Sequence, residues 1–265
     1  MLLVIDIGNT NTSLGVYDDD KLVAHWRLTT ARSRTVDEWG VHARNLFALA
    51  SLDFKSIDAI AIASVVPPLN FTLKQMAERY FELTPLFIDH TVDSGLPILY
   101  EPPSEVGADR IVDAVAAIKK YGAPCIVVDF GTATTFDAIN SQGEYLGGVI
   151  TPGISISSEA LFQRTAKLPR VEIKRPENVI GSTTVEAMQS GLYHGYVGLV
   201  DGILRKMIDE LGGTPRVIAT GGLAPLIAKG SEFIEEVDET LTLEGMRLVY
   251  ERQQGVSSFE VRVSS

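Results

Sequence analysis

The chain has 265 residues, which is enough for two modest domains or one large one with buried cores. Its hydrophobic fraction of 45% and charged fraction of 22% are those of an ordinary globular protein. The net charge of −11 argues against DNA or RNA as a partner, because a phosphate backbone attracts basic surfaces. It does not argue against a nucleotide, whose phosphates can be held by backbone N–H groups, metal ions and a few local donors.

Several features predict a cytoplasmic protein without a membrane partner. The first residues, Met1–Ile5, carry no basic leader and are typical of a strand. The longest apolar runs, such as 59–66, are much shorter than the roughly 20 residues that a membrane span needs. Cys125 is the one cysteine, so no intrachain disulfide can form, and its apolar neighbours predict a buried side chain.

The first half of the chain predicts a three-stranded meander followed by alternating helices and strands. Alternation of apolar residues, as in 59–63, indicates the strands. The expected strands are 2–7, 12–18, 21–28, 58–65 and 85–88, and the expected helices are 36–50, 70–82 and 105–121.

The second half predicts the same order of elements. Apolar residues at helical spacing indicate its longest helix, for example Val197, Val200 and Leu204. The expected strands are 124–129, 133–140, 143–150, 215–220 and 233–236, and the expected helices are 154–164, 183–211, 223–229 and 241–252. Both halves therefore read as α/β domains, each a mixed sheet flanked by helices.

A direct repeat supports duplication. Residues 4–12 (VIDIGNTNT) align without gaps with residues 127–135 (VVDFGTATT), and the Val, Asp, Gly and last Thr are identical. We therefore predict two similar domains, 1–118 and 119–265, with a cleft between them.

The repeated turns are candidates for a phosphate site. Glycine lets the chain turn and lets a ligand approach the backbone, and the Asn and Thr side chains that follow Gly8 offer donors to an anion. Asp6 is placed to hold Mg²⁺, usually through water. One such turn alone is equally typical of a hairpin rich in turn residues. The second copy, 129–135, favours a pair of turns that hold a triphosphate from both sides.

Other glycine-containing turns are weaker signals. Thr220–Gly222 lies between a strand and a helix, where a nucleoside can approach closely. Gly147–Gly148 and Pro152–Gly153 are equally weak indications of a ligand site. Residues 107–110 (GADR) open a helix, and their spacing alone favours a simple N-terminal acid at Asp109. The sequence lacks the GxxxxGK[ST], GxGxxG and HExxH motifs.

The paired Asp-x-Gly turns with a late Thr-Gly-Gly resemble the actin, hexokinase and heat-shock ATPase superfamily. Within it, the order of motifs over residues 2 to about 252 is similar to that of type III pantothenate kinases, with GADR as the sharpest match. The other matching motifs include 181–184 (GSTT) and 241–245 (LTLEG). The resemblance implies duplicated ribonuclease H-like, actin-like domains with an interdomain cleft. Pro102 departs from the family, whose members often have Asn there.

This resemblance also implies a function and a site. The activity would be phosphorylation of the primary hydroxyl of pantothenate by ATP, the first step toward coenzyme A. Asp109 would be the catalytic base, and the family is usually a homodimer. Asp129 would bind a monovalent cation, K⁺ or NH₄⁺, beside Mg²⁺ near Asp6. The ATP-binding residues would be Asp6, Ile7, Gly8, Asn9, Thr10, Asn11, Thr12, Ser13 and Thr132. The pantothenate-binding residues would be Tyr100, Gly107, Ala108, Asp109, Arg110 and Thr184.

Two alternatives stay open at the level of sequence. One is a sugar or acetate kinase of the same superfamily, although those chains are generally longer. The other is a non-catalytic nucleotide-binding regulator or an actin-like assembly protein, against which the intact Asp109 argues.

Overall fold

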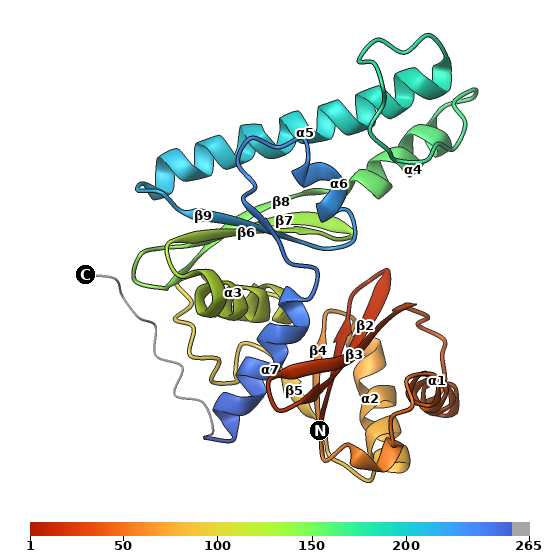
Figure 1. The fold of residues 1–265 in the computed structure, drawn as a ribbon, viewed down its shortest axis with the longest axis vertical. Helices are drawn as coiled ribbons and strands as arrows, with labels where there is room; N and C mark the ends of the chain where they lie inside the picture. The colour runs from red at the N-terminus through yellow and green to blue at the C-terminus, as the bar shows by residue number, and fades with distance from the viewer. Residues whose placement is uncertain (256–265) are drawn as a thin grey trace. The chain divides into compact units, whose positions relative to one another are not determined.

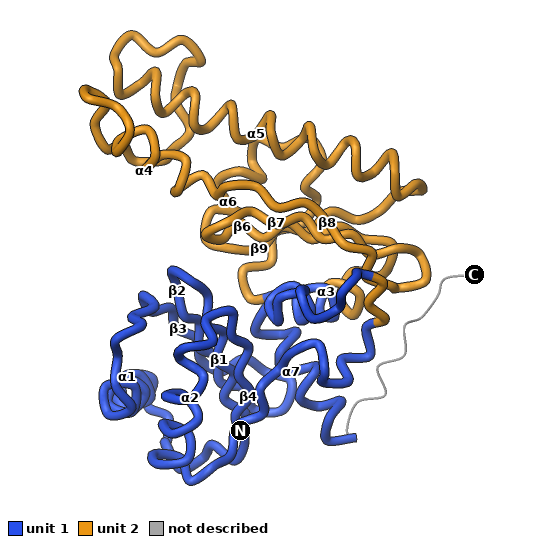
Figure 2. Tube along the Cα trace, turned by 180° about the vertical axis from the view of Figure 1, so that it is seen from behind, with its two compact units in different colours: residues 1–96, 100–116, 241–260 blue, residues 97–99, 117–240, 261–265 orange. Residues whose placement is uncertain are grey.

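The computed structural model describes residues 1–255, which form two compact units (Figures 1 and 2). Of the described residues, the first unit contains 1–96, 100–116 and 241–255, and the second contains 97–99 and 117–240. Helix α3 (Ala108–Tyr121) contributes residues to both units. The predicted boundary after residue 118 falls inside this helix. The last ten residues of the predicted second domain, 256–265, lie outside the described residues.

The first unit is built on a five-stranded mixed sheet in the order β3-β2-β1-β4-β5. The β1–β2 and β2–β3 pairs are antiparallel, whereas β4 and β5 run parallel to β1. The strands are β1 (Leu2–Ile7), β2 (Asn11–Asp18), β3 (Lys21–Thr29), β4 (Ala59–Ser64) and β5 (Leu86–Ile88).

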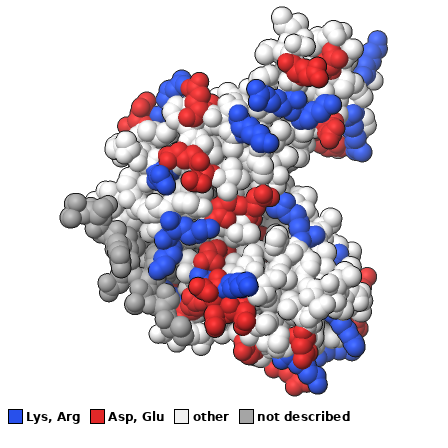
Figure 3. Space-filling view, in the orientation of Figure 1, with Lys and Arg blue, Asp and Glu red and all other residues white. Residues whose placement is uncertain are grey.

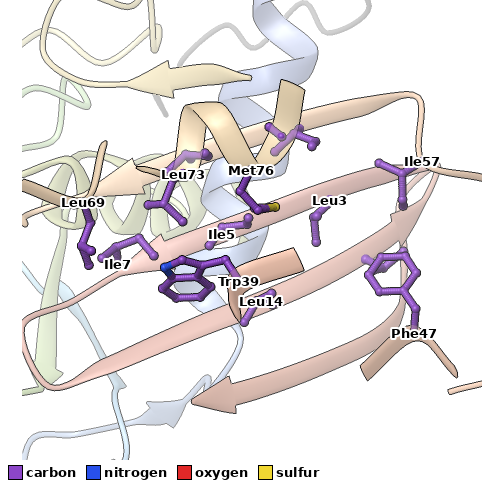
Figure 4. Packing of buried hydrophobic residues seen from close by; sticks show 14 of the residues in the cluster. Leu3, Ile5, Ile7, Leu14, Trp39, Phe47, Ile57, Leu69, Leu73 and Met76 are labelled. Atoms are coloured by element: carbon purple, nitrogen blue, oxygen red, sulfur yellow. The ribbon is translucent and has the colours of Figure 1, made fainter. Parts of the chain in front are cut away.

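Helices α1 (Val36–Leu49) and α2 (Pro67–Met76) cover one face of this sheet. Because side chains alternate along a strand, the odd-numbered residues of β1 point to this face and pack against both helices (Figure 4). Thr35 caps α1, and its side chain and Glu38 exchange hydrogen bonds with each other's backbone. A π-helical turn, Ala77–Phe81, extends α2.

Helix α7 (Leu241–Gln253) packs in the same unit, against β1, β2 and β4. It also lies directly against α3 in the first unit. A Cβ atom on Gly245 would be 1.9 Å from the carbonyl oxygen of Val112, so the glycine permits the two helices to touch backbone to backbone.

The second unit repeats this topology. Its sheet has the order β8-β7-β6-β9-β10, with the first three strands antiparallel and the last two parallel to β6. The strands are β6 (Cys125–Phe130), β7 (Ala133–Ile139), β8 (Tyr145–Pro152), β9 (Arg216–Thr220) and β10 (Glu236–Val237). Strand for strand, β6 corresponds to β1, β7 to β2 and β9 to β4. This correspondence confirms the predicted duplication.

Three helices cover one face of the second sheet: α4 (Ile154–Arg164), α5 (Thr184–Leu211) and α6 (Ala224–Ala228). Apolar residues of α5 such as Tyr196, Val200 and Leu204 pack on Ile126 and Val128 of β6. The helical spacing read from the sequence therefore marks the buried face of α5.

The predicted elements are all present, most with ends within one residue of the expected ones, and the helix expected from 70 begins three residues earlier, at Pro67. The helix expected from 105 begins at Ala108, because Pro103–Glu105 forms a separate 3₁₀ turn. Strand β8 begins two residues late, because the side chain of Asn140 accepts hydrogen bonds from the backbone N–H groups of Gln142 and Glu144 and lengthens the turn. The strand expected at 233–236 is observed at Glu236–Val237, so the two ranges share only Glu236.

Over residues 1–255, no helix is both long enough and apolar enough to cross a membrane.

The contact at Gly245 leads to a prediction about stability. Replacing Gly245 with Ala would force α7 away from α3 and should lower the free energy of unfolding by about 2–3 kcal/mol, as overpacking does in other cores. The matched control is Gly202→Ala in α5, where a Cβ would meet no atom within 4 Å, so that helix propensity should leave stability unchanged or slightly higher. Urea titration of both variants checks this. Equal midpoints for Gly245→Ala and the unmodified protein would contradict the prediction.

Candidate active site

The first Asp-x-Gly turn joins β1 to β2. Asp6 lies opposite Ser13 in the strand register, and the Gly8 N–H donates to the carbonyl oxygen of Asn11 at 3.0 Å. A Cβ on Gly8 would lie 2.9 Å from that oxygen, so glycine is required for the turn to close. Asn9, Thr10 and Asn11 are exposed, so the turn lies at the surface of the unit.

The segment after β3 supports this turn. Thr30 donates its backbone N–H to the Thr10 carbonyl oxygen at 2.9 Å and its hydroxyl to the Gly8 carbonyl oxygen at 2.8 Å. Its hydroxyl also lies 2.9 Å from that of Thr12, which is fully buried. Ile7 is buried in the core as well. The side chains of Ile7 and Thr12 therefore lie in the interior and support the turn.

The second Asp-x-Gly turn, at the end of β6, is enclosed by glycines from other segments. Asp129 lies opposite Thr135 and beside Thr220 in the strand registers. Gly221 has a φ of +90°, and a Cβ there would be 2.5 Å from a carboxylate oxygen of Asp129. A Cβ on Gly131 would be 3.1 Å from its other oxygen. The backbone therefore reaches the carboxylate from two directions.

The end of β8 closes on the same turn. The Gly153 N–H donates to the Thr132 carbonyl oxygen at 3.2 Å, and a Cβ on Gly153 would lie 2.3 Å from that oxygen. Tyr196 of α5 fixes the strands beside it, because its hydroxyl lies 2.5 Å from the Thr134 hydroxyl and donates to the Pro152 carbonyl oxygen at 3.0 Å. Three motifs that are separate in the sequence thus meet around Asp129.

Asp109 lies in the first turn of α3. Its Oδ1 atom accepts a hydrogen bond from the Arg110 backbone N–H at 2.9 Å, and a Cβ on Gly107 would approach the same oxygen to 2.4 Å. Gly107 therefore leaves the space that this carboxylate occupies. Ala108 and the Arg110 side chain are buried.

Burial raises the pKa of Asp109 above its usual value, because removing water disfavours the charged form. The hydrogen bond from the Arg110 N–H and the Arg110 charge act in the opposite direction but do not cancel the effect. A carboxylate with a raised pKa is a stronger base, which is the property that proton abstraction near neutral pH requires.

The remaining predicted residues are distributed over both units. Tyr100 is half-buried in the loop that precedes Pro102, in the first unit. Thr184 is exposed at the start of α5, in the second unit, next to the capping residue Thr183. Each unit thus carries one Asp-x-Gly turn and part of the predicted pantothenate set.

The donor atoms fit the expected cations. Among residues 1–255 there is no group of three or more His, Cys, Asp or Glu side chains arranged around one metal position. Asp6 alone would leave most positions of Mg²⁺ to water and phosphate, as this ion prefers. At Asp129, the space that Cβ atoms on Gly131 and Gly221 would fill is bordered by a carboxylate and by backbone, a donor set suited to a large monovalent cation.

Comparison with known proteins assigns the family. A protein-family model for type III pantothenate kinase matches residues 2–206. Two relatives, from Koribacter versatilis and an Anaeromyxobacter species, are each 59% identical and bear that name; the alignments cover 96% of this chain and 96% and 100% of theirs. The chain belongs to the type III pantothenate kinase family. A further member of this family, from Halalkalibacterium halodurans, is 55% identical over 95% of this chain and 99% of its own.

Solved structures confirm the fold class. A putative Baf family transcriptional activator from Campylobacter jejuni aligns with a TM-score of 0.57 at 20% identity, covering 96% of this chain and 99% of that one. The activator of 2-hydroxyisocaproyl-CoA dehydratase from Clostridium difficile, solved with bound ADPNP, aligns with a TM-score of 0.53 at 11% identity, covering 98% and 99%. The fold is that of duplicated ribonuclease H-like domains, as in actin-like ATPases.

The raised pKa of Asp109 makes stability depend on pH in a defined direction. Between the unfolded pKa, about 3.9, and the raised folded pKa, the folded state binds more protons, so stability falls as pH rises through this window. Asp109→Asn removes this penalty and keeps an oxygen for the Arg110 N–H. The variant should therefore gain in Tm over the unmodified protein as pH increases from about 4.5 to 8.

The control for this measurement is Asp93→Asn. The hydrogen bond from Arg252 holds the pKa of Asp93 below its usual value, so this substitution should lose relative stability as pH rises. Thermal unfolding at matched ionic strength compares the two. A pH-independent Tm difference for Asp109→Asn would contradict the assigned shift.

Proposed function

We propose that this protein transfers the γ-phosphoryl group of ATP to the primary hydroxyl of pantothenate, giving 4'-phosphopantothenate and ADP. This reaction is the first step of coenzyme A biosynthesis. The observation that carries the proposal is Asp109: it lies in the GADR motif, within the stretch that the family model matches, and burial raises its pKa. Asp109 accepts the hydroxyl proton while the oxygen attacks the γ-phosphorus and ADP leaves.

The proposed binding residues follow the two turns and the start of α3. Asp6–Ser13 and Thr132 hold ATP, with exposed Asn and Thr side chains and backbone N–H groups as donors. Tyr100, Gly107–Arg110 and Thr184 hold pantothenate, and the Arg110 charge suits its carboxylate. Phosphoryl transfer needs positioning and charge stabilisation from the protein rather than covalent chemistry, and hydrogen-bond donors and a cationic side chain can supply both.

Two cations complete the proposed site. Asp6 would hold Mg²⁺, mainly through water, and Asp129 would hold K⁺ or NH₄⁺ beside Gly131 and Gly221. Such ions neutralise the charge that develops on the phosphates during transfer. Neither Asp-x-Gly turn contains a lysine or arginine, so positive charge has to come from outside the turns.

We further propose a cytoplasmic homodimer without a nucleic-acid partner. On the face drawn in Figure 3, Lys and Arg side chains lie among Asp and Glu and form no continuous basic stripe. Large apolar side chains are exposed along β8, α4 and the start of α5, which is unusual for a surface that faces water alone. They are Leu146, Ile150, Ile156, Leu161, Phe162, Val179, Ile180 and Val185.

The central test is Asp109→Asn. Asn keeps the size and the hydrogen bond to the Arg110 N–H but cannot accept the substrate proton, so kcat should fall by about 10²–10⁴-fold. Calorimetric binding of ATP and pantothenate on the same preparation should be retained. Glu105→Gln, an exposed carboxylate in the preceding turn, is the control and should leave kcat unchanged. A fall of less than about threefold for Asp109→Asn, against that range, would mean that Asp109 is not the base.

Activity should also depend on a monovalent cation at Asp129. Turnover should be low in sodium or Tris chloride and rise when potassium or ammonium replaces it at the same ionic strength, because Mg²⁺ alone leaves part of the phosphate charge uncompensated. Asp129→Asn should remove this response to potassium. Full turnover of the unmodified protein in a buffer without potassium and ammonium would disprove the dependence.

A further inference from the structure

The segment between β3 and α1, residues 30–35, is fixed at both ends. At its start, Thr30 is bonded to Gly8 and Thr10 of the first Asp-x-Gly turn. At its end, Thr35 caps α1 and exchanges hydrogen bonds with Glu38. The Arg34 N–H donates to the Ala31 carbonyl oxygen at 3.1 Å, so the segment makes a tight turn between these anchors. The side chains in the middle of the segment are therefore held beside the first Asp-x-Gly turn.

Arg32 projects from this segment onto the turn. Its Nη2 atom donates to the side-chain oxygen of Asn9 at 3.0 Å. Several arginines of the molecule pair with carboxylates, for example Arg79 with Asp37 at 2.8 Å and Arg170 with Glu159 at 2.7 Å. Arg32 has no carboxylate within ion-pair distance in the described part of the chain, and its side chain is exposed. An uncompensated cation thus lies next to a turn that itself contains none.

The hydrogen bond also orients Asn9. Because Oδ1 accepts from Arg32, the Nδ2 group points elsewhere, and it makes no hydrogen bond to any residue that the structure describes. Asn9 therefore presents N–H donors, and Arg32 keeps further guanidinium N–H groups for a second acceptor. Both sets of donors suit phosphate oxygens.

The second unit indicates that this segment is not required by the fold. There β8 ends at Pro152 and α4 begins at Ile154, with only Gly153 between them. Gly153 bonds to its turn through the backbone, as Thr30 does in the first unit. The same topology thus forms without a counterpart of residues 31–35. What the longer segment adds to the first unit is the charge of Arg32 beside Asn9.

We propose that Arg32 binds the phosphates of the nucleotide and holds Asn9 in the orientation that donates to them. The inference rests on the proposed function, because it takes the first Asp-x-Gly turn to be the ATP phosphate site. Arg32 supplies the fixed positive charge that the first turn lacks. Arg32 binds a di- or triphosphate chain and does not contribute to binding of the adenosine part of the nucleotide.

The test compares Arg32→Gln with Arg44→Gln, which removes one exposed charge from α1 without touching the turn. For Arg32→Gln, the KM for ATP should rise by about tenfold or more, the usual effect of losing a charge-assisted hydrogen bond, while the KM for pantothenate stays constant. The inhibition constant of inorganic tripolyphosphate should rise in this variant, whereas that of adenosine should stay constant. Arg32→Lys should recover part of the affinity, because it keeps the charge without the planar fork.

A second variant, Asn9→Asp, separates this role from a structural one. The new carboxylate would pair with Arg32, preserve the segment and repel phosphate, so ATP affinity should fall while the Tm holds. Unchanged ATP and tripolyphosphate binding in both Arg32→Gln and Asn9→Asp would overturn the inference. If the unmodified protein itself binds no ATP, the proposed function fails as well. If it binds ATP, and Arg32→Gln and Asn9→Asp bind ATP and tripolyphosphate as tightly as it does, the inference alone is wrong.

Discussion

The site depends on the way each central strand ends. Strand β1 pairs with β2 in antiparallel and with β4 in parallel orientation, and β6 pairs with β7 and β9 in the same way. The last residues of β1 and β6 are therefore held by strands on both sides. Near its end each strand carries a half-buried aspartate followed by a glycine turn, in which a Cβ would lie 2.9 Å from the Asn11 carbonyl oxygen at Gly8 and 3.1 Å from an Asp129 carboxylate oxygen at Gly131. A rigid strand therefore places a carboxylate and a set of backbone N–H groups at one fixed position, and the ligand does not have to order them.

The surrounding segments use close backbone contacts to complete this arrangement. Gly153 and Gly221 bring β8 and β9 up to the second turn, and Gly107 makes room for the carboxylate of Asp109. In each case a Cβ atom would occupy the space, so the contact limits which residue can be present. The desolvation that raises the pKa of Asp109 is a consequence of the same close packing.

Local patterns in the sequence predicted the strands and helices well, because apolar periodicity reports which face of an element is buried. The errors lie where side chains reshape a turn, as Asn140 does before β8, or where a proline starts a separate turn, as Pro103 does before α3. The repeat of 4–12 in 127–135 was sufficient to predict the duplicated topology.

The supporting residues of the site were less accessible to such reasoning. Thr30 and Arg32 belong to a polar segment whose composition only indicates a loop, and their contact with the turn depends on the register of the β2–β3 hairpin, in which Asn11 pairs with Thr29. Tyr196 reads as one more apolar residue of α5, although its hydroxyl fixes the ends of β7 and β8. Contacts between residues that are distant in sequence depend on how the strands pair. The periodicity of apolar residues along one element does not predict them.

The two copies of the turn differ in a way that suits different ligands. In the first, Asn9, Thr10 and Asn11 are exposed and a cationic side chain lies beside them. In the second, glycine backbone surrounds the carboxylate of Asp129, and the segment that could carry a side chain is reduced to Gly153. An open turn with N–H donors and an arginine favours an anion, whereas an enclosed carboxylate favours a cation. Duplication thus gives the same strand geometry twice, and the connections after β3 and β8 give the two turns different surroundings, with Arg32 beside the first and Gly153 beside the second.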